Sequence, residues 1–524
     1  MQKSLLFLCT LFLASASLKA QFTLNKSNVV FPETTVGSSS QKSVVLSNSS
    51  SQTIAFEATS SDNKFVVEPS NFVLEPGKSQ SLKLDFEPST NMFEVAVIFI
   101  TSNGIYGDQG IVVSGQGRYE DSYYASTQNL EEQALKDELK RIISKGYTNL
   151  GYTTCRDKMY SDIDNINGKV TCVYTGRSAS FTTRSGANSN SFNCEHTWPQ
   201  SLFNKSEPER ADIHHLFPTD VNANSRRGSY PFGVVSNASW SEGGSKVGGS
   251  KFEPRDDHKG DVARAMFYFA IRYQNYSGFL NSQESVLRQW YKSDLPSTKE
   301  INRNESIFSY QKNRNPFVDH PEFLDRISSI SSTSSKSVIL DLCLSRTTLN
   351  WINPDVKGAE EFTIVLNNCG NAELNDLKYS LENGVITLHN QAQTLAVDSI
   401  VLLRVSVDPS AVSEKGKWSD KITIRNGNTV LDEITFEIET GSVQATNAGG
   451  FSLLHSVESQ TLSIQTSIED SFDLQMINQN GQTVKSLTGI NQHKSIDLSE
   501  LKSGVYYIRI QGKASFHIAK IFIP

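Results

Sequence analysis

The stretch SFNCEHTWPQSLF, residues 191–203, places an acid and an imidazole side by side, Glu195 and His196. Neighbouring side chains of an ideal strand point to opposite faces, so these two can serve one site only where a strand ends or bulges. Pro199 supplies such an end, because proline cannot donate a hydrogen bond to a β-ladder. We therefore expect a strand that ends beside two titratable side chains. The alternative interpretation is a surface acid next to a hydrogen-bonded core histidine.

A second polar segment, ADIHHLFPTDVNANSRRGSYPFG at residues 211–233, is dense in His, Asn and Arg. Pro218 and the threonine after it predict the start of a short helix, and Gly228 predicts its end. On that helix Asn222 and Arg226 lie one turn apart on the same face. The segment is therefore expected to present an amide and a guanidinium group together.

An acid, an imidazole, an amide and an arginine are together what metal-assisted hydrolysis of a phosphodiester requires. The side-chain oxygens of Glu195 and Asn222 are hard ligands suited to Mg²⁺, which keeps several waters and completes its shell with phosphate oxygens. A guanidinium group fits phosphate through its charge and its fork of donors. Zinc is the competing interpretation of His214 and His215, but adjacent histidines without further His or Cys ligands at the usual spacings form a weak zinc pattern.

Four motifs resemble, in order, the landmark motifs of the endonuclease I family, secreted or periplasmic bacterial nucleases with the ββα-metal (His-Me) finger. They are CEHTWPQ at 194–200, DIHHLFPTDVNANSRRGSYPFG at 212–233, FEPRDDHKGDVARAMFYFAIRY at 252–273 and RNPFVDHPEFL at 314–324. The resemblance covers residues 118–335. Independently of it, residues 260–276 are apolar nearly all round, which predicts a helix buried in the middle of this domain.

The resemblance implies a mechanism and a set of roles. His196 would be the general base that takes a proton from the attacking water, and Glu195 with Asn222 would hold one Mg²⁺, for which Mn²⁺ or Ca²⁺ could substitute. Products would carry 5′-phosphates. The imidazole must be neutral, so activity should fall below a pH near its pKa, about 6.5 if unperturbed.

Further residues are candidates for contact with the phosphate or for support of the site. For the arginine at the scissile phosphate we rank Arg226 first, with Arg210, Arg227 and Arg177 as the other candidates. Asp212, His214 and His215 could orient His196 or support the metal waters, and the alternative is that they pack and cap the turn.

The chain of 524 residues is too long for one hydrophobic core. Before and after the middle domain, short runs alternate apolar and polar residues between turn clusters, which predicts β-sandwiches. The first resembles the immunoglobulin-like modules of bacterial surface proteins. The C-terminal tail resembles the sorting domains of the type IX secretion system. We expect a signal peptide at 1–20, an immunoglobulin-like sandwich at 21–117, the catalytic domain at 118–335, a second sandwich at 336–439, a linker at 440–449 and the sorting domain at 450–524.

The expected fold class is multidomain: a mixed α+β, mostly helical ββα-metal nuclease domain flanked by all-β immunoglobulin-like sandwiches and a small C-terminal β domain. Lys3 and the short apolar run after it are typical of a cleaved signal peptide. We expect no transmembrane segment, and a protein that is secreted or attached to the cell surface after export across the outer membrane. The secretion machinery is then a partner of the C-terminal domain.

Cysteine pairing is possible in an exported protein. Cys343 and Cys369 fall in one later segment and are expected to bridge each other. Among the remaining three mature cysteines we favour a bridge between Cys172 and Cys194, because both flank the opening motif.

The formal net charge of −7 leaves no overall basic field, so binding of nucleic acid must depend on a local cleft. The expected partner is DNA, and also RNA, cleaved with little sequence preference. The alternative is a non-catalytic cell-surface adhesin built of immunoglobulin-like modules. A dead copy should have lost Glu195, His196 or Asn222, and all three are present.

Overall fold

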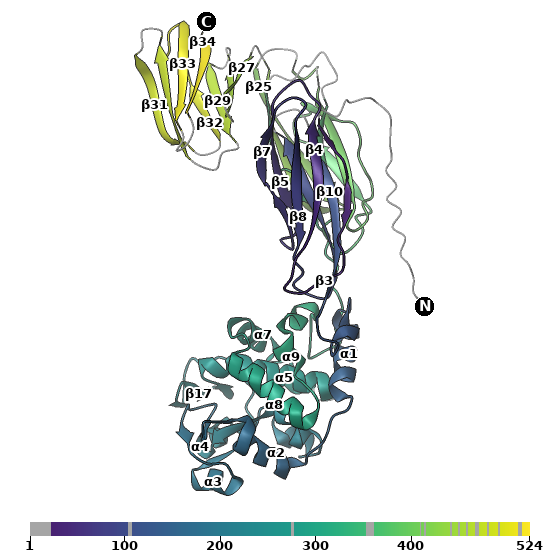
Figure 1. Ribbon diagram of the computed structural model, residues 1–524, viewed down its shortest axis with the longest axis vertical. Helices are drawn as coiled ribbons and strands as arrows, with labels where there is room; N and C mark the ends of the chain where they lie inside the picture. The colour runs from purple at the N-terminus through teal and green to yellow at the C-terminus, as the bar shows by residue number, and fades with distance from the viewer. Residues whose placement is uncertain are drawn as a thin grey trace. The chain divides into compact units, whose positions relative to one another are not determined.

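The structure, a computed structural model, divides into two compact units (Figure 1). It describes residues 22–102, 107–273, 277–352, 361–408, 410–412, 416–440, 443–448, 451–456, 460–466, 471–478, 482–490, 493–511 and 516–523. One unit holds residues up to 89, 93–117 and 338–524, and the other holds 90–92 and 118–337. The predicted signal peptide lies outside the described residues. Within them, no helix has both the length and the apolar character needed to cross a membrane.

The first unit begins with a two-sheet β-sandwich. Its strands alternate buried and exposed residues, as in Ile54–Ser60, so that one face of each sheet forms the core. One sheet has the order β1 (Phe22–Leu24), β4 (Ser40–Asn48), β8 (Ser79–Phe86), β6 (Phe65–Glu68). The other has the order β2 (Asn28–Val30), β10 (Gln109–Arg118), β9 (Phe93–Ser102), β5 (Ile54–Ser60), β7 (Asn71–Leu74), and β3 (Thr34–Thr35) also pairs with β10.

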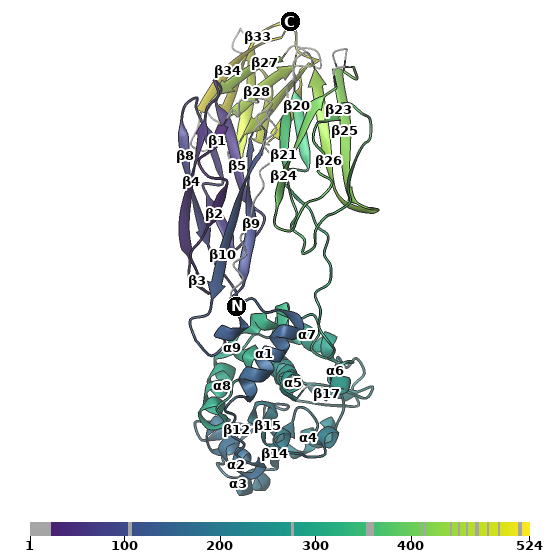
Figure 2. The same cartoon turned by 90° about the vertical axis from the view of Figure 1, so that its right-hand side faces the viewer.

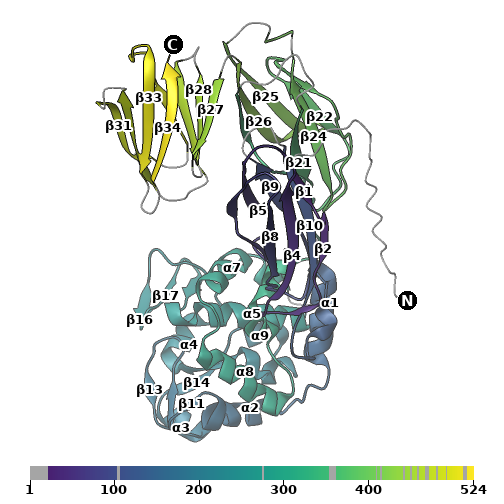
Figure 3. The same ribbon diagram turned by 45° about the horizontal axis from the view of Figure 1, so that its top comes forward.

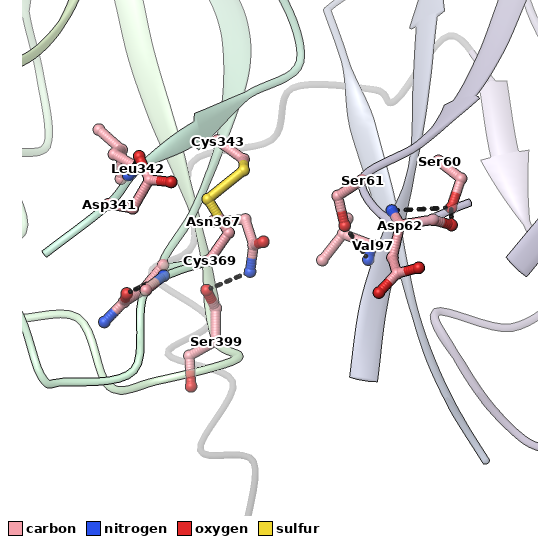
Figure 4. Close-up of a disulfide and its surroundings, with 12 residues drawn as sticks. Ser60, Ser61, Asp62, Val97, Asp341, Leu342, Cys343, Asn367, Cys369 and Ser399 are labelled. Carbon is pink, nitrogen blue, oxygen red and sulfur yellow. Dashed lines mark hydrogen bonds between the residues drawn. A yellow bond between two sulfur atoms is a disulfide. The ribbon is translucent and has the colours of Figure 1, made fainter. Parts of the chain in front are cut away.

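A second sandwich with its own core follows the helical domain in the chain. One sheet contains β19 (Cys343–Leu344), β21 (Phe362–Asn367), β24 (Ile400–Val407) and β23 (Ile386–Leu388), in that order. The other contains β20 (Thr348–Ile352), β26 (Thr429–Thr440), β25 (Gly416–Asn426) and β22 (Leu377–Leu381). The predicted bridge between Cys343 and Cys369 is confirmed, and Figure 4 shows it as the bond between two sulfur atoms.

The C-terminal tail, yellow in Figure 1, forms two further four-stranded sheets. One is β27 (Val443–Ala448), β28 (Phe451–Ser456), β29 (Thr461–Thr466) and β32 (His493–Asp497), and the other is β31 (Thr483–Ile490), β30 (Phe472–Asn478), β33 (Gly504–Gln511) and β34 (Phe516–Ile523). Residues 443–448, expected within a linker, form β27 and pair with β28.

The second unit is the helical one. Its central helix is α5 (Lys259–Tyr273), which Figure 3 labels among the other helices. The residues of α5 from 262 to 272 are all buried, as the nearly uniform apolar sequence predicted. Around it lie α1 (Glu132–Ser144), α7 (Glu284–Ser293), α8 (Thr298–Gln311) and α9 (Pro316–Asp319). The description "mostly helical", which was given for the nuclease domain, does not hold for the chain as a whole, which is 40% strand and 24% helix because the sandwiches and the tail contribute most of its regular structure. The helical region is this one unit.

Removing the Cys343–Cys369 bridge by a double substitution with alanine is expected to lower the unfolding free energy of the second sandwich by about 2–4 kcal/mol. The bridge closes a loop with a sequence separation of 26, and opening it returns chain entropy to the unfolded state. Denaturant unfolding of oxidised protein, followed by tryptophan fluorescence, measures the change. Wild type with reducing agent is the control and should unfold like the double variant. A double variant with the same denaturation midpoint as oxidised wild type would contradict the prediction.

Candidate active site

Two strands and a helix build the site. β14 (Phe192–His196) pairs antiparallel with β15 (Leu216–Asp220), with Glu195 opposite Phe217, and α4 (Val221–Arg227) follows β15 directly (Figure 2). The expectation of a strand that ends at the acid and imidazole pair is confirmed. The amide of Asn224 donates to the Cys194 carbonyl and so fastens α4 to β14. The three elements make a ββα finger.

The predicted start of the helix was wrong. Pro218 and Thr219 belong to β15, where Pro218 lies opposite Cys194, and α4 begins three residues later than Pro218. The helix starts where Asp220 can cap it, because the carboxylate of Asp220 accepts from the backbone N–H groups of Asn222 and Ala223. The end is as predicted: Gly228 follows the helix with a φ of 53°.

Glu195 is 2% exposed and is held by two donors. Its Oε1 accepts from the Tyr174 hydroxyl at 2.8 Å and lies 3.3 Å from Nη1 of Arg227. Burial raises the pKa of Glu195, and the charge of Arg227 and the Tyr174 hydrogen bond oppose that shift. Neither donor uses Oε2, so one carboxylate oxygen has no hydrogen-bond partner among the described residues. That oxygen is available to a cation.

Asn222 lies in the first turn of α4, and its side chain is exposed. A carboxylate oxygen and an amide oxygen are hard donors, and two protein ligands with several waters are the usual shell of Mg²⁺. The described residues contain no group of three or more His, Cys, Asp or Glu that could hold a metal. Glu195 and Asn222 are therefore the residues whose side-chain oxygens could hold a single cation.

His196 is buried, and its ring has a defined tautomer. Nε2 lies 3.2 Å from the backbone carbonyl oxygen of Arg210. Because a carbonyl can only accept, Nε2 carries the proton and the neutral ring keeps its lone pair on Nδ1. Burial, with the nearby charges of His215, Arg210 and Arg156, lowers the pKa of His196 well below its usual range. The imidazole is therefore neutral at lower pH than an exposed histidine would be.

The four candidate arginines occupy different surroundings. Arg227 is 1% exposed and donates to the His196 and Thr197 carbonyls besides facing Glu195. Arg177 forms an ion pair with Asp220 at 2.6 Å, which ties it to the finger. Arg226 is exposed on α4. Arg210 lies over the Tyr152 ring, 4.3 Å from its centroid, and forms no ion pair within the described part of the chain.

The acid and two histidines predicted to support the site are all buried. Asp212 is fully buried and accepts from Tyr268, Arg272, Tyr273 and Gln311. The His215 ring lies 5.5 Å from the His196 ring, and its Nε2 donates to the Glu209 carbonyl. Nε2 of His214 donates instead to the Asn313 carbonyl. Only His215 of the three contacts the ring of His196.

The favoured bridge between Cys172 and Cys194 is wrong, since both thiols are free, as is Cys155. The Cys172 sulfur accepts from the backbone N–H groups of Asp220 and Thr175. The Cys194 sulfur donates to the Glu195 carbonyl. Each thiol thus has its own backbone partner, and burial raises the pKa of Cys194 to about 12.

Three residues at the site were not predicted: Tyr174, Tyr152 and Arg156. Tyr174 bonds to Glu195, and the Tyr152 ring lies 5.3 Å from the His196 ring. Arg156 lies on α2 (Tyr152–Lys158), one turn after Tyr152. The four-residue spacing on a helix was the one signal in the sequence that joined the last two.

Replacing Asp212 by asparagine is expected to lower the unfolding free energy at pH 7 by about 3–5 kcal/mol, because the Arg272 charge is left buried without its partner. Burial alone would raise the pKa of Asp212, but Arg272, both histidines and Gln311 lower it from 3.8 to about 2. A depressed pKa adds stability above the unfolded value, and that stability is lost as pH falls through the folded value. The difference between wild type and variant should therefore narrow from pH 4 to pH 2. Denaturant unfolding at several pH values measures the difference in unfolding free energy between wild type and variant. A difference that stays constant from pH 4 to pH 2 would contradict the prediction.

Known proteins resemble separate parts of this chain. Residues 131–322 match the family model described as Endonuclease I, residues 458–524 match the secretion system C-terminal sorting domain, and residues 17–109 match the model described as Abnormal spindle-like microcephaly-assoc'd, ASPM-SPD-2-Hydin. The extracellular ribonucleases of Bacillus subtilis (strain 168) and Bacillus amyloliquefaciens are each 38% identical over 227 residues, which covers 40% of this chain and 78% of each relative. A PapD-like domain of human CEP192 is similar at 15% identity, over 22% of this chain and 99% of that one, with a TM-score of 0.19.

Proposed function

Because this chain belongs to the endonuclease I family, we propose that it is a Mg²⁺-dependent endonuclease that hydrolyses phosphodiester bonds of DNA and RNA with little sequence preference and leaves 5′-phosphates. The C-terminal sorting domain and the extracellular relatives make it a secreted or cell-surface protein. The two relatives are named ribonucleases, which supports RNA as one substrate.

The tautomer of His196 is the observation that carries the proposal. With Nε2–H donated to the Arg210 carbonyl, Nδ1 is the lone pair that can accept a proton from water. Arg227 donates to the carbonyls of His196 and Thr197 and so holds this end of β14 in place. His196 is thus held by two hydrogen bonds: its backbone carbonyl accepts from Arg227, and its Nε2–H donates to the Arg210 carbonyl.

Glu195 and Asn222 would hold the metal ion. Mg²⁺, when bound, supplies positive charge to the scissile phosphate and to the leaving 3′ oxygen. Tyr174 donates a hydrogen bond to Oε1 of Glu195, and Arg227 forms an ion pair with the same oxygen, which leaves Oε2 for the cation. Asp220 caps α4 through Oδ1, which sets the place of Asn222 in the first turn of the helix.

Among the candidate arginines, the surroundings favour Arg210 for the scissile phosphate. Arg227 and Arg177 each have a carboxylate partner, whereas Arg210 has none among the described residues. Its backbone carbonyl binds His196, so its side chain starts beside the base. Arg226, which we ranked first from the sequence, is exposed and lies one helical turn from Asn222. It is the second candidate.

The experiment is nicking of supercoiled plasmid and degradation of total RNA by purified protein, residues 21–524, with Mg²⁺ or with excess chelator. We expect open circles that appear only with the metal, and RNA fragments from the same preparation. Ligation of the DNA ends without prior phosphorylation tests for 5′-phosphates. Intact plasmid and intact RNA would instead favour the non-catalytic adhesin.

A further inference from the structure

Two guanidinium groups share one aromatic ring beside the base. The Arg156 guanidinium carbon lies 4.2 Å from the centre of the Tyr152 ring, and that of Arg210 lies 4.3 Å from the same centre. The Tyr152 ring in turn lies 5.3 Å from the His196 ring. Both arginines are only half-buried, so each can be reached from solvent.

Neither of these arginines is neutralised. Within the described part of the chain, Arg156 and Arg210 form no ion pair, and the Nε of each is buried without a hydrogen-bond partner. Nearby arginines differ: Arg184 forms an ion pair with Asp157 at 2.6 Å, and Arg177 with Asp220. Two uncompensated cations held close together repel each other, and an anion removes that cost. The pair is therefore suited to a negatively charged ligand.

We propose that Arg156, braced on Tyr152, forms a second phosphate subsite that binds the phosphodiester next to the scissile one on the same strand. This rests on the proposed function, in which Arg210 and the metal ion serve the scissile phosphate. A phosphodiester carries a single negative charge, which Arg210 and a bound cation would together already neutralise. The charge of Arg156 is then left for the neighbouring phosphate of the strand.

Tyr152 has a positioning role in this subsite. Its ring gives both guanidinium groups an aromatic surface to lie on, so neither group is held by a carboxylate that would compete with phosphate. Tyr152 and Arg156 occupy the same face of α2, one turn apart. The subsite is thus built on a helix that precedes the ββα finger in the chain.

Short thymidine substrates test the subsite. One is a trimer with two phosphodiesters, and two others replace either the 5′ or the 3′ linkage by an uncharged methylphosphonate, so that one cleavable bond has a neutral neighbour. A dimer with a single phosphodiester is the fourth. The variants are Arg156→Gln, Arg156→Lys and, as a matched control, Arg141→Gln, which removes an exposed arginine of α1 that pairs with Glu138.

For wild type we expect one of the two methylphosphonate trimers to lose about ten- to a hundredfold in kcat/KM relative to the charged trimer, the range of a charge-assisted hydrogen bond. In Arg156→Gln the two should agree within about twofold, and the dimer should be cleaved as by wild type. Arg156→Lys should recover part of the loss, and Arg141→Gln should leave the preference intact. On long single-stranded DNA, Arg156→Gln should reduce the salt slope of log kcat/KM by about 0.7.

Three outcomes would overturn the subsite. In the first, Arg156→Gln loses as much kcat/KM on the dimer as on the trimer. In the second, the difference between the two methylphosphonate trimers persists in Arg156→Gln. In the third, wild type cleaves both methylphosphonate trimers as fast as the charged trimer. A lower melting temperature in Arg156→Gln with unchanged substrate preference would make the residue structural. Failure of the proposed function looks different, because wild type would then cleave neither plasmid nor RNA.

Discussion

Replacing His196 by alanine is expected to lower kcat for plasmid nicking by about a hundred- to ten-thousandfold, the range of general base catalysis. The substitution removes Nδ1, the nitrogen that the Arg210 carbonyl leaves free to accept a proton. KM should change little, since the imidazole is not expected to bind the phosphate. Initial rates of nicking at saturating Mg²⁺, with the ratio of open circles to supercoiled plasmid read over time, measure the effect.

The matched control is His320→Ala. His320 lies in the same domain but outside the ββα finger, and its ring nitrogens hydrogen-bond to Glu322 and Asp121. It should keep wild-type activity at a temperature where both variants remain folded. If His196→Ala nicked plasmid at the wild-type rate, His196 could not be the general base.

Local patterns predicted those features of the fold that local physics decides. A strand ends near Pro199 because proline breaks the ladder, and β14 does end at His196. Most residues of α5 are apolar and leave it no polar face to turn to solvent, so its residues from 262 to 272 are buried. The two arginines among them are paired with buried carboxylates. The Cys343–Cys369 bridge joins two cysteines of one sandwich, and no other cysteine lies in that segment.

The errors came where a partner distant in sequence decides the conformation. Pro218 and Thr219 were predicted to start a helix, yet β14 lies alongside them and pairs them into β15. Cys172 was expected to form a disulfide with Cys194, but its sulfur instead accepts a hydrogen bond from the backbone N–H of Asp220. Neither contact is visible in the residues next to those positions.

The arginines illustrate the same limit at the candidate site. Arg226 and Arg227 are neighbours, and the helical spacing from Asn222 favoured the first for the phosphate. The side chain of Arg227 turns inward to Glu195, while Arg226 stays in solvent. Arg156 precedes Glu195 by thirty-nine positions in the sequence, and both Arg156 and Arg210 lie over the ring of Tyr152. Helical spacing relates residues one turn apart and cannot report such a contact.

Removal of divalent cations is expected to abolish nicking, and Asn222→Ala is expected to raise the Mg²⁺ concentration for half-maximal activity by at least about tenfold, since it leaves Glu195 as the sole protein ligand. Because the Asn222 side chain is exposed, its loss should not change the melting temperature.

The matched control for Asn222→Ala is Ser225→Ala, on the same helix, whose hydroxyl donates back to the Val221 carbonyl. Titration of plasmid-nicking rate with MgCl₂ after chelation separates the variants: the control should follow wild type, and Asn222→Ala should approach the wild-type rate only at high Mg²⁺. A rate unaffected by chelator would exclude the cation. If the MgCl₂ titration of Asn222→Ala overlaid that of wild type, the requirement for the cation would stand but Asn222 would not be one of its ligands. Glu195 would then be the protein ligand to test next.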